Sequence, residues 1–436
     1  MENTLTLVNI KELRKVVCLP SSKSISNRAI VIGALAGQKE PPRHVSDCDD
    51  TRVMLRWLMS SEVPSIIDIG AAGTAMRFST ALLSVLPGEH IITGTERMQQ
   101  RPIGILVEAL RQLGASITYI NKEGFPPLKI GTPSASPEGE AKGQRVNGSI
   151  SQQADEREGR GKISLSGSVS SQYISALLMI GPVMPEGLTL NLTGNIVSRP
   201  YIDMTLAIMR DFGAVCGWQD ESTLHVEPRP YVVRDYYVES DWSAASYWYE
   251  MVALSDDAQA EVRLPGLFRQ SLQGDAEGAQ LFRQLGVETR YEETDGQPVV
   301  EVRKGWQVAE RLDYDFVRIP DLAQTFVVTC CMMGVPFHFT GLQSLKIKET
   351  DRIEALKTEM RKLGYVLIDR NDSELLWNGS RCEAENDPTI DTYEDHRMAM
   401  AFAPAALRLG KLHIRHPEVV SKSYPGFWDD IKAMVL

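Results

Sequence analysis

The sequence predicts an α/β protein of two domains, each assembled from copies of one small unit. Three observations support this prediction. A chain of 436 residues is longer than one hydrophobic core usually serves, so two domains are expected. A helix-like segment that ends in Arg-x-[Leu/Phe]-Gly occurs four times. Each copy is followed by alternating apolar and polar residues, which is typical of a strand.

The repeated segments read ALRQLGASITYI, IMRDFGAVCGW, LFRQLGVETRY and EMRKLGYVLID, and their glycines are Gly114, Gly213, Gly286 and Gly364. Glycine readily adopts the left-handed conformation that ends many helices, and a basic residue in the last turn suits the helix dipole. Runs such as TYINKEGFPPLKI then predict a hairpin. The spacing of roughly 70–100 residues exceeds that of solenoid repeats, so we expect α/β modules in two lobes. Two further modules are expected around MLRWLMSSEVPSIIDI and AALRLGKLHIRHPEVV.

Residues Ser134 to Lys162 interrupt this pattern, because they are polar and contain no aromatic residue. Such a segment buries too little apolar surface to offset its ordering entropy. We interpret it as a flexible surface insertion, with a functional lid as the alternative.

Composition excludes several classes of protein. The net charge of −11 argues against nucleic acid as a partner, although a local pocket can still bind a small anion. The first residues lack the apolar core of a signal peptide, and the most apolar tract, 326–339, is too short to span a membrane. The six cysteines form no CxxC pair or metal spacing. We therefore expect a cytoplasmic protein without a metal.

Cations and hydroxyls gather repeatedly where an apolar helix is predicted to begin. The segment LPSSKSISNRAIVIGALAG carries Lys23, Ser24 and Arg28, and IGAAGTAMRFSTALL contains Gly73 in a turn. Arg101 precedes a proline suited to the first turn of a helix. Backbone N–H groups and cations at a helix start favour an anion. Taken singly, each could be an ordinary capped helix or a solvated charge.

Hydroxyl clusters follow in SGSVSSQYISALLM, with Ser170, Ser171 and Gln172, and in NIVSRPYIDMTL, with Ser198 and Tyr201. These residues could bind a phosphate or sugar-like hydroxyls, or they could simply cap helices.

The C-terminal half adds a charged set that could equally be capping boxes or surface ion pairs. Its members are Asp321, Lys346, Lys348, Glu349, Asp351, Arg352, Glu394, Asp395, His396, Arg397 and Lys422. If the modules share one architecture, their helix starts converge on one side. We therefore predict a cationic cleft for a ligand with several negative charges.

These segments together resemble the 5-enolpyruvylshikimate-3-phosphate synthase family. The resemblance rests on SSKSISNRA, GAAGTAMR, ERMQQRPIG, GSVSSQY, SRPYIDMT, ESDWSAASY, IPDLAQT, KIKETDRI, YEDHRMAMA and SKSYPGF, in the family's order. It implies an enolpyruvyl transferase fold of two lobes, each with three βαβαββ-type repeats, and an active site between the lobes. One lobe would be 20–237, including the insertion 134–162, and the other would combine 1–19 with 238–436.

The resemblance also implies a reaction, in which the enolpyruvyl group of phosphoenolpyruvate passes to the 5-hydroxyl of shikimate 3-phosphate. Phosphate is released through a tetrahedral intermediate, no cofactor is needed, and the protein is expected to be a monomer. The implied catalytic residues are Lys23, Asp321, Glu349, His396 and Lys422. Implied contacts to shikimate 3-phosphate are Lys23, Ser24, Arg28, Ser170, Ser171, Ser198, Tyr201, Asp321 and Lys348. Those to phosphoenolpyruvate are Lys23, Gly73, Arg101, Arg352, Arg397 and Lys422, with Gln172 between the two ligands.

The chain departs from the family pattern at three positions. Ala71 replaces a usual Asn, Phe78 a common Pro, and Ser344 a common Asn in the ligand segment. Ser344, a shorter donor, would reach a ligand through a bridging water.

Three other interpretations compete with this one. A sister enolpyruvyl transferase acting on UDP-N-acetylglucosamine would share the lobes, but no cysteine stands in a comparable context and KETDR favours the shikimate branch. A non-enzymatic anion-binding protein would bind phosphate without forming product. A domain of a larger fused enzyme is disfavoured because the motifs fill the chain.

Overall fold

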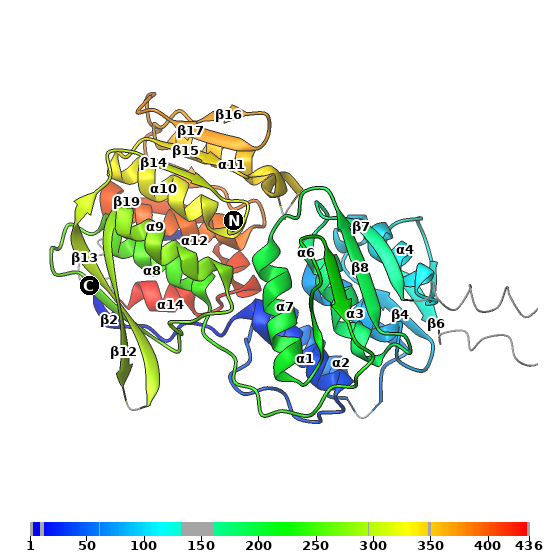
Figure 1. The fold of residues 1–436 in the computed structure, drawn as a ribbon. Coiled ribbons are helices and arrows are strands. Elements are labelled where there is room, and N and C mark those ends of the chain that lie inside the picture. The colour runs from blue at the N-terminus through cyan, green and yellow to red at the C-terminus, as the bar shows by residue number, and fades with distance from the viewer. Residues whose placement is uncertain are drawn as a thin grey trace, which may run out of the picture. The chain divides into compact units, whose positions relative to one another are not determined.

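The computed structural model describes residues 3–8, 13–60, 62–131, 161–294, 296–347 and 350–433. The chain divides into two compact units, drawn in Figure 1. Unit 1 comprises Met1–Lys23, Ser46–Asp49 and Val238–Leu436, and unit 2 comprises Ser24–Val45 and Asp50–Tyr237. Of the predicted insertion 134–162, only Gly161 and Lys162 belong to the described residues.

Unit 2 contains a βαβαββ module with a four-stranded sheet. Its first two strands are parallel, and the hairpin that follows adds two antiparallel strands, giving the order β3-β4-β6-β5. The elements are β3 (Ile66–Asp68), α3 (Gly73–Leu83), β4 (His90–Thr93), α4 (Gly104–Gln112), β5 (Ser116–Tyr119) and β6 (Leu128–Gly131).

A second module in unit 2 has the same order, β7-β8-β10-β9. Its elements are β7 (Lys162–Ser166), α6 (Ser171–Ile180), β8 (Leu188–Thr193), α7 (Arg199–Asp211), β9 (Cys216–Trp218) and β10 (Thr223–Val226). Two helices precede the modules, α1 (Lys23–Leu35) and α2 (Asp49–Leu58).

Unit 1 repeats the arrangement twice, as β12-β13-β11-β2 and β14-β15-β17-β16. The first copy consists of β2 (Arg14–Val16), α8 (Trp242–Leu254), β11 (Glu261–Pro265), α9 (Gly278–Gln284), β12 (Leu285–Thr294) and β13 (Gln297–Val308). The second consists of β14 (Leu312–Asp315), α10 (Ala323–Met333), β15 (Phe337–Thr340), α11 (Arg352–Lys362), β16 (Ile368–Arg370) and β17 (Glu374–Trp377).

A shorter copy closes unit 1 and joins the two ends of the described chain. It contains β18 (Thr389–Ile390), α12 (His396–Phe402) and β19 (Lys411–Arg415). In the place that a hairpin strand takes elsewhere, β1 (Thr4–Val8) pairs antiparallel with β19. The helices α13 (Ala406–Leu409) and α14 (Phe427–Lys432) complete the unit.

The predicted glycine caps are confirmed. Gly114, Gly213, Gly286 and Gly364 have φ values of 98°, 88°, 75° and 87°. Gly114, Gly213 and Gly364 each follow a helix and precede a hairpin of two antiparallel strands, whereas Gly286 is the second residue of the hairpin strand β12. The two further modules expected around 54–69 and 405–420 differ from the prediction. There α2 leads into the first strand of the next module, and α13 leads into β19, without a hairpin of its own.

The core of unit 1 is helical. Every residue of α8 except Ser243 is buried, and so is all of α12. Figure 1 shows α8, α10 and α12 inside unit 1 with its strands around them. Helices buried on all sides need apolar residues throughout, so a charged residue on one of them calls for a partner. No helix among the described residues is long and apolar enough to cross a membrane.

Candidate active site

Arg352 lies at the start of α11, where the chain is ordered by a helix cap. Asp351 provides this cap, because its Oδ1 accepts a hydrogen bond of 3.2 Å from the Glu354 N–H. The Arg352 side chain is only 1% exposed and forms ion pairs with two carboxylates. Its Nε lies 2.6 Å from Asp395 Oδ2, and its Nη1 lies 3.0 Å from Asp321 Oδ1. A buried guanidinium needs such partners, since an unpaired buried charge is costly.

Asp321 joins Arg352 to a second arginine. It lies in the short 3-10 helix η4 (Pro320–Leu322), directly before α10. Its Oδ2 accepts a hydrogen bond of 3.0 Å from Arg397 Nη2. The side chains of Asp321 and Arg397 are 15% and 11% exposed, so both retain some access to solvent. One carboxylate is therefore held between two guanidinium groups.

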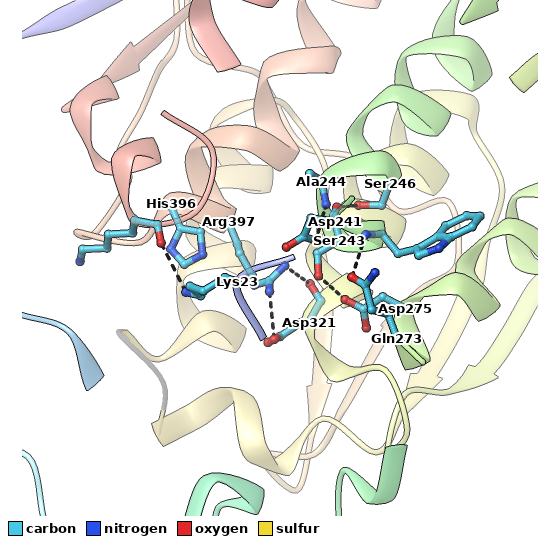
Figure 2. A network of polar contacts seen from close by, with 12 residues as sticks. Lys23, Asp241, Ser243, Ala244, Ser246, Gln273, Asp275, Asp321, His396 and Arg397 are labelled. Carbon is cyan, nitrogen blue, oxygen red and sulfur yellow. Dashed lines mark hydrogen bonds and ion pairs between the residues drawn. The ribbon is translucent and has the colours of Figure 1, made fainter. Parts of the chain in front are cut away.

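The start of α12 supplies the other side of this cluster. Asp395 caps that helix by accepting a hydrogen bond of 2.9 Å from the Arg397 N–H. His396 is buried, and its Nδ1 lies 3.9 Å from Asp395 Oδ1. Figure 2 shows Lys23, Asp321, His396 and Arg397 within one network of polar contacts.

Two lysines approach the same part of unit 1. Lys422 ends the 3-10 helix η7 (Pro417–Lys422), and its Nζ donates to the carbonyl oxygen of Glu394 at 2.7 Å. Lys23 Nζ donates to the carbonyl oxygen of Lys422 at 3.4 Å. We call the set Lys23, Asp321, Arg352, Asp395, His396, Arg397 and Lys422 the unit 1 cluster.

A third carboxylate, Asp275, lies next to this cluster in the 3-10 helix η3 (Gly274–Glu277). It accepts a hydrogen bond from Ser243, the one residue of α8 that is not buried. Burial raises the pKa of Asp275 to about 7, and the Asp321 carboxylate adds to this rise while Arg397 opposes it. Asp275 therefore changes charge near neutral pH.

Unit 2 holds a buried cation of its own. Arg28, on α1, donates to Thr205 Oγ1 at 2.7 Å, to Ser175 Oγ at 3.0 Å and to the Ser24 carbonyl at 2.8 Å. Burial lowers the pKa of Arg28 to about 10. The guanidinium also stacks on Phe78, with its Cζ 5.4 Å from the ring centre.

A second cationic group of unit 2 surrounds the first turn of α3. Arg77 Nη1 donates to Gln172 Oε1 at 2.6 Å, and Gln172 Nε2 donates to Thr74 Oγ1 at 3.2 Å. A Cβ on Gly73 would lie 2.6 Å from Arg101 Nη1 and 3.1 Å from Arg77 Nη1. The missing side chain thus lets two arginines approach a helix N-terminus, where anions bind readily. We call Gly73, Thr74, Arg77, Arg101 and Gln172 the unit 2 cluster.

Comparison with known proteins shows the family to which this chain belongs. Residues 59–431 match the family model described as EPSP synthase (3-phosphoshikimate 1-carboxyvinyltransferase). The 3-phosphoshikimate 1-carboxyvinyltransferase of Bacteroides fragilis is 58% identical over 421 residues, which cover 97% of this chain and 95% of that protein. The chain belongs to the EPSP synthase family. Another relative of that name, from Aliivibrio salmonicida, is 34% identical over 99% of both chains.

A solved EPSP synthase from Acinetobacter baumannii has the same fold. The TM-score is 0.73 at 20% identity, over 99% of this chain and 98% of that one. The predicted mixed α/β architecture of repeated modules is therefore confirmed for this member of the EPSP synthase family.

The structure brings together most of the predicted residues of unit 1 and three of those of unit 2. The unit 1 cluster contains the predicted Lys23, Asp321, Arg352, His396, Arg397 and Lys422. The unit 2 cluster contains the predicted Gly73, Arg101 and Gln172. Lys348 and Glu349 lie outside the described residues.

The predicted hydroxyl groups are mostly placed at helix starts. Ser170 caps α6 by accepting from the Gln172 N–H at 3.4 Å, and Ser171 is the first residue of that helix. Ser198 precedes α7 with a left-handed φ of 55°. The Tyr201 carbonyl accepts from Arg28 at 3.4 Å. Ser344 lies partly buried in the 3-10 helix η5 (Gln343–Ile347).

Sequence reasoning missed two charged residues at these clusters, Arg77 and Asp275. Arg77 stands four residues after Gly73, which places both on one face of α3, so the spacing could have indicated it. Asp275 follows a glycine in an ordinary polar segment, and nothing in the sequence pattern distinguishes it. Only its burial in the folded chain does so.

Proposed function

We propose that the protein transfers the enolpyruvyl group of phosphoenolpyruvate to the 5-hydroxyl of shikimate 3-phosphate and releases phosphate. Membership of the EPSP synthase family supports this reaction. The single observation that carries it is the Asp321 carboxylate held between Arg352 and Arg397. A carboxylate placed among cations can accept a proton while those cations bind an anionic substrate.

The first step joins the two substrates. The 5-hydroxyl oxygen bonds to C2 of phosphoenolpyruvate, and Asp321 accepts the hydroxyl proton with Lys23 assisting its movement. Glu349 donates a proton to C3, which leaves a tetrahedral phospho-ketal. Collapse of this intermediate breaks the C2–O bond to phosphate, and Glu349 takes back a proton from C3. The proton that Asp321 accepted passes to the departing phosphate, which leaves as hydrogen phosphate. Electrons and protons balance without an external reagent.

The cations of unit 1 stabilise the negative charge that develops in these steps. Phosphate and carboxylate suit the planar fork of an arginine, and a lysine adds a compact point charge. We assign Arg352, Arg397 and Lys422 to the leaving phosphate and the carboxylate of phosphoenolpyruvate. His396 lies beside Asp395 and completes the proposed catalytic set.

The cations of unit 2 serve binding in this proposal. Gly73 and Arg101, with the newly found Arg77, would hold phosphoenolpyruvate at the start of α3. Ser24, Arg28, Ser170, Ser171, Ser198 and Tyr201 would contact shikimate 3-phosphate. Gln172, which binds both Arg77 and Thr74, would lie between the two ligands. Lys348 and Ser344 complete the proposed substrate contacts.

The experiment is a phosphate-release assay on Asp321→Asn. This change keeps the shape of the side chain and removes its ability to accept a proton. We expect turnover to fall about 10²–10⁴-fold. Binding of shikimate 3-phosphate, measured by calorimetry, should stay within about three-fold of the original, which is a difference under 1 kcal/mol.

Asp313→Asn is the matched control, because Asp313 is 56% exposed and pairs with Arg311. It should retain full turnover. Undiminished turnover in Asp321→Asn would contradict the assigned role. A parallel assay with UDP-N-acetylglucosamine in place of shikimate 3-phosphate tests the sister activity. Phosphate release in that assay would show that UDP-N-acetylglucosamine is the acceptor.

We also propose that the protein acts as a monomer in the cytoplasm on these two small anions. Light scattering of the purified chain tests the first point, and fractionation of cells that express it tests the second.

A further inference from the structure

The loop that leads into α12 contains two adjacent residues in the left-handed conformation. Tyr393 has a φ of 53° and Glu394 a φ of 57°, and neither is a glycine. Each such residue costs on the order of 1–3 kcal/mol and persists only where the surroundings hold it. The structure must therefore contain contacts that hold this turn.

Glu359 provides these contacts from within α11. It is 0% exposed and uses both carboxylate oxygens. Oε1 accepts a hydrogen bond of 2.6 Å from the Tyr393 hydroxyl, and Oε2 accepts one of 3.0 Å from the Asp391 N–H. Lys362 Nζ, 2.8 Å from Oε2, compensates the buried charge. Burial and the Glu359 carboxylate both raise the pKa of Tyr393, so its hydroxyl keeps the donated proton.

The same helix also holds the far end of the turn. Arg352 and Glu359 are seven residues apart, so they lie on one face of α11 two turns from each other. Arg352 contacts Asp395, which follows the strained pair, while Glu359 contacts Asp391 and Tyr393. The strained pair is thus fixed from both sides by one rigid element.

The turn presents a carbonyl to a lysine of the unit 1 cluster. Lys422 Nζ donates to the Glu394 carbonyl oxygen at 2.7 Å. Because φ and ψ at Glu394 determine where that carbonyl points, a different conformation would remove the acceptor from Lys422. The Lys422 carbonyl oxygen in turn accepts a hydrogen bond of 3.4 Å from Lys23 Nζ.

We propose that Glu359 and Tyr393 are positioning residues for the reaction: they hold the Glu394 carbonyl in its left-handed turn and thereby fix the Lys422 ammonium. This inference rests on the proposed function, in which Lys422 binds the phosphoenolpyruvate side. In this proposal neither residue contacts a substrate. They hold the backbone of Glu394, and the Glu394 carbonyl in turn determines where the Lys422 ammonium lies.

The test uses Tyr393→Phe, which removes only the hydroxyl that Glu359 binds. We expect kcat/KM for phosphoenolpyruvate to fall about ten-fold, through a higher KM as well as a lower kcat, which corresponds to about 1.4 kcal/mol. The Kd for shikimate 3-phosphate should be unchanged. A role in folding alone would lower the fraction of active enzyme, and kcat with it, but would leave KM unaltered. Glu359→Gln is less suitable, because it also removes the buried charge that pairs with Lys362 and alters the acceptor of the Asp391 N–H.

A rescue variant tests the mechanism of the effect. Glycine adopts a positive φ without strain, so Glu394→Gly relieves one of the two strained positions and lessens the need for the contact between Glu359 and Tyr393. The double variant Tyr393→Phe/Glu394→Gly should recover most of the lost kcat/KM. Tyr314→Phe is the control, since Tyr314 donates a 2.7 Å hydrogen bond to Glu277 in the same unit and should show no loss.

The outcomes separate the two proposals. If the original chain releases no phosphate from the two substrates, the proposed function fails. If the original chain is active and Tyr393→Phe keeps its KM and kcat, or loses activity that glycine does not restore, the positioning role is wrong.

Discussion

Gly73 is a position where one added carbon should change substrate binding. A Cβ there would lie 2.6 Å from Arg101 Nη1 and 3.1 Å from Arg77 Nη1. Both contacts involve ends of flexible side chains, so the fold can adapt while the guanidinium groups move away. We expect Gly73→Ala to raise KM for phosphoenolpyruvate about ten-fold or more, which is over 1.4 kcal/mol, with the melting temperature nearly unchanged.

The control is Gly217→Ala in β9, where an added Cβ meets nothing within 4 Å. Its KM should match that of the original chain. An unchanged KM in Gly73→Ala would contradict the assignment of phosphoenolpyruvate to the unit 2 cluster.

Asp275 predicts an unusual dependence of stability on pH. Burial raises its pKa to about 7 from an ordinary 3.8, so between these values the folded chain binds a proton that the unfolded chain has lost. The contribution of Asp275 to the free energy of unfolding therefore falls as pH rises from about 4 to 7. Above pH 7 the folded protein bears the full cost of burying the charged carboxylate. Arg397, Asp321, Asp241 and Ser243 are the charged and polar neighbours that set this value.

Asp275→Asn should remove the penalty. We expect its free energy of unfolding, relative to that of the original chain, to rise by about 3 kcal/mol between pH 5 and pH 8. Urea unfolding at both pH values measures this difference. A relative stability that stays flat or falls over the same range would show that Asp275 does not titrate as described.

The sequence identified most charged members of the two clusters, because residue type and position at a helix start are both visible there. It could not show which side chain pairs with which. The contact between Arg352 and Asp395 joins residues 43 positions apart, and burial alone distinguishes Asp275 from other surface-like aspartates. The roles assigned to the site residues stay predictions.

At the scale of elements, the four capping glycines make the modules recognisable. A helix that ends at glycine and continues as a hairpin is a local pattern, so the sequence alone predicts it. The pairing of β1 with β19 and of β2 with β11 joins strands that are distant along the chain. No local pattern reveals such pairs. The module expected around 405–420 is therefore predictable as far as α13, Gly410 and β19, but its pairing with β1 is not.

Gly114→Ala tests how much one glycine cap contributes to the free energy of unfolding. Gly114 has a φ of 98°, and an added Cβ would meet nothing within 4 Å, so the cost comes from backbone conformation alone. We expect a loss of about 1–2 kcal/mol in the free energy of unfolding. Gly426→Ala is the control, because that site is equally open and has a φ of −82°. Equal stability of the two variants in urea would contradict the capping role.

At the scale of the whole chain, unit 2 interrupts the first module of unit 1. The chain leaves unit 1 after Lys23 and forms all of unit 2, with a short return to unit 1 at Ser46–Asp49. It re-enters unit 1 at Val238 and continues with α8. Glu239 stabilises this return, since its buried carboxylate accepts from the Phe268 N–H, Ser271, Gln273 and Trp242. The predicted lobe boundaries at 20 and 237 stay a prediction, as do the roles of Lys348 and Glu349.

The most direct measurement of the central claim is phosphorus NMR of the purified chain with phosphoenolpyruvate and shikimate 3-phosphate together. The account predicts that inorganic phosphate appears in equal amount to the phosphoenolpyruvate consumed, while the 3-phosphate signal shifts to that of a new ester and is not lost. No phosphate should appear when shikimate 3-phosphate is left out. Phosphate release without the acceptor, or no release with both substrates present, would contradict the account.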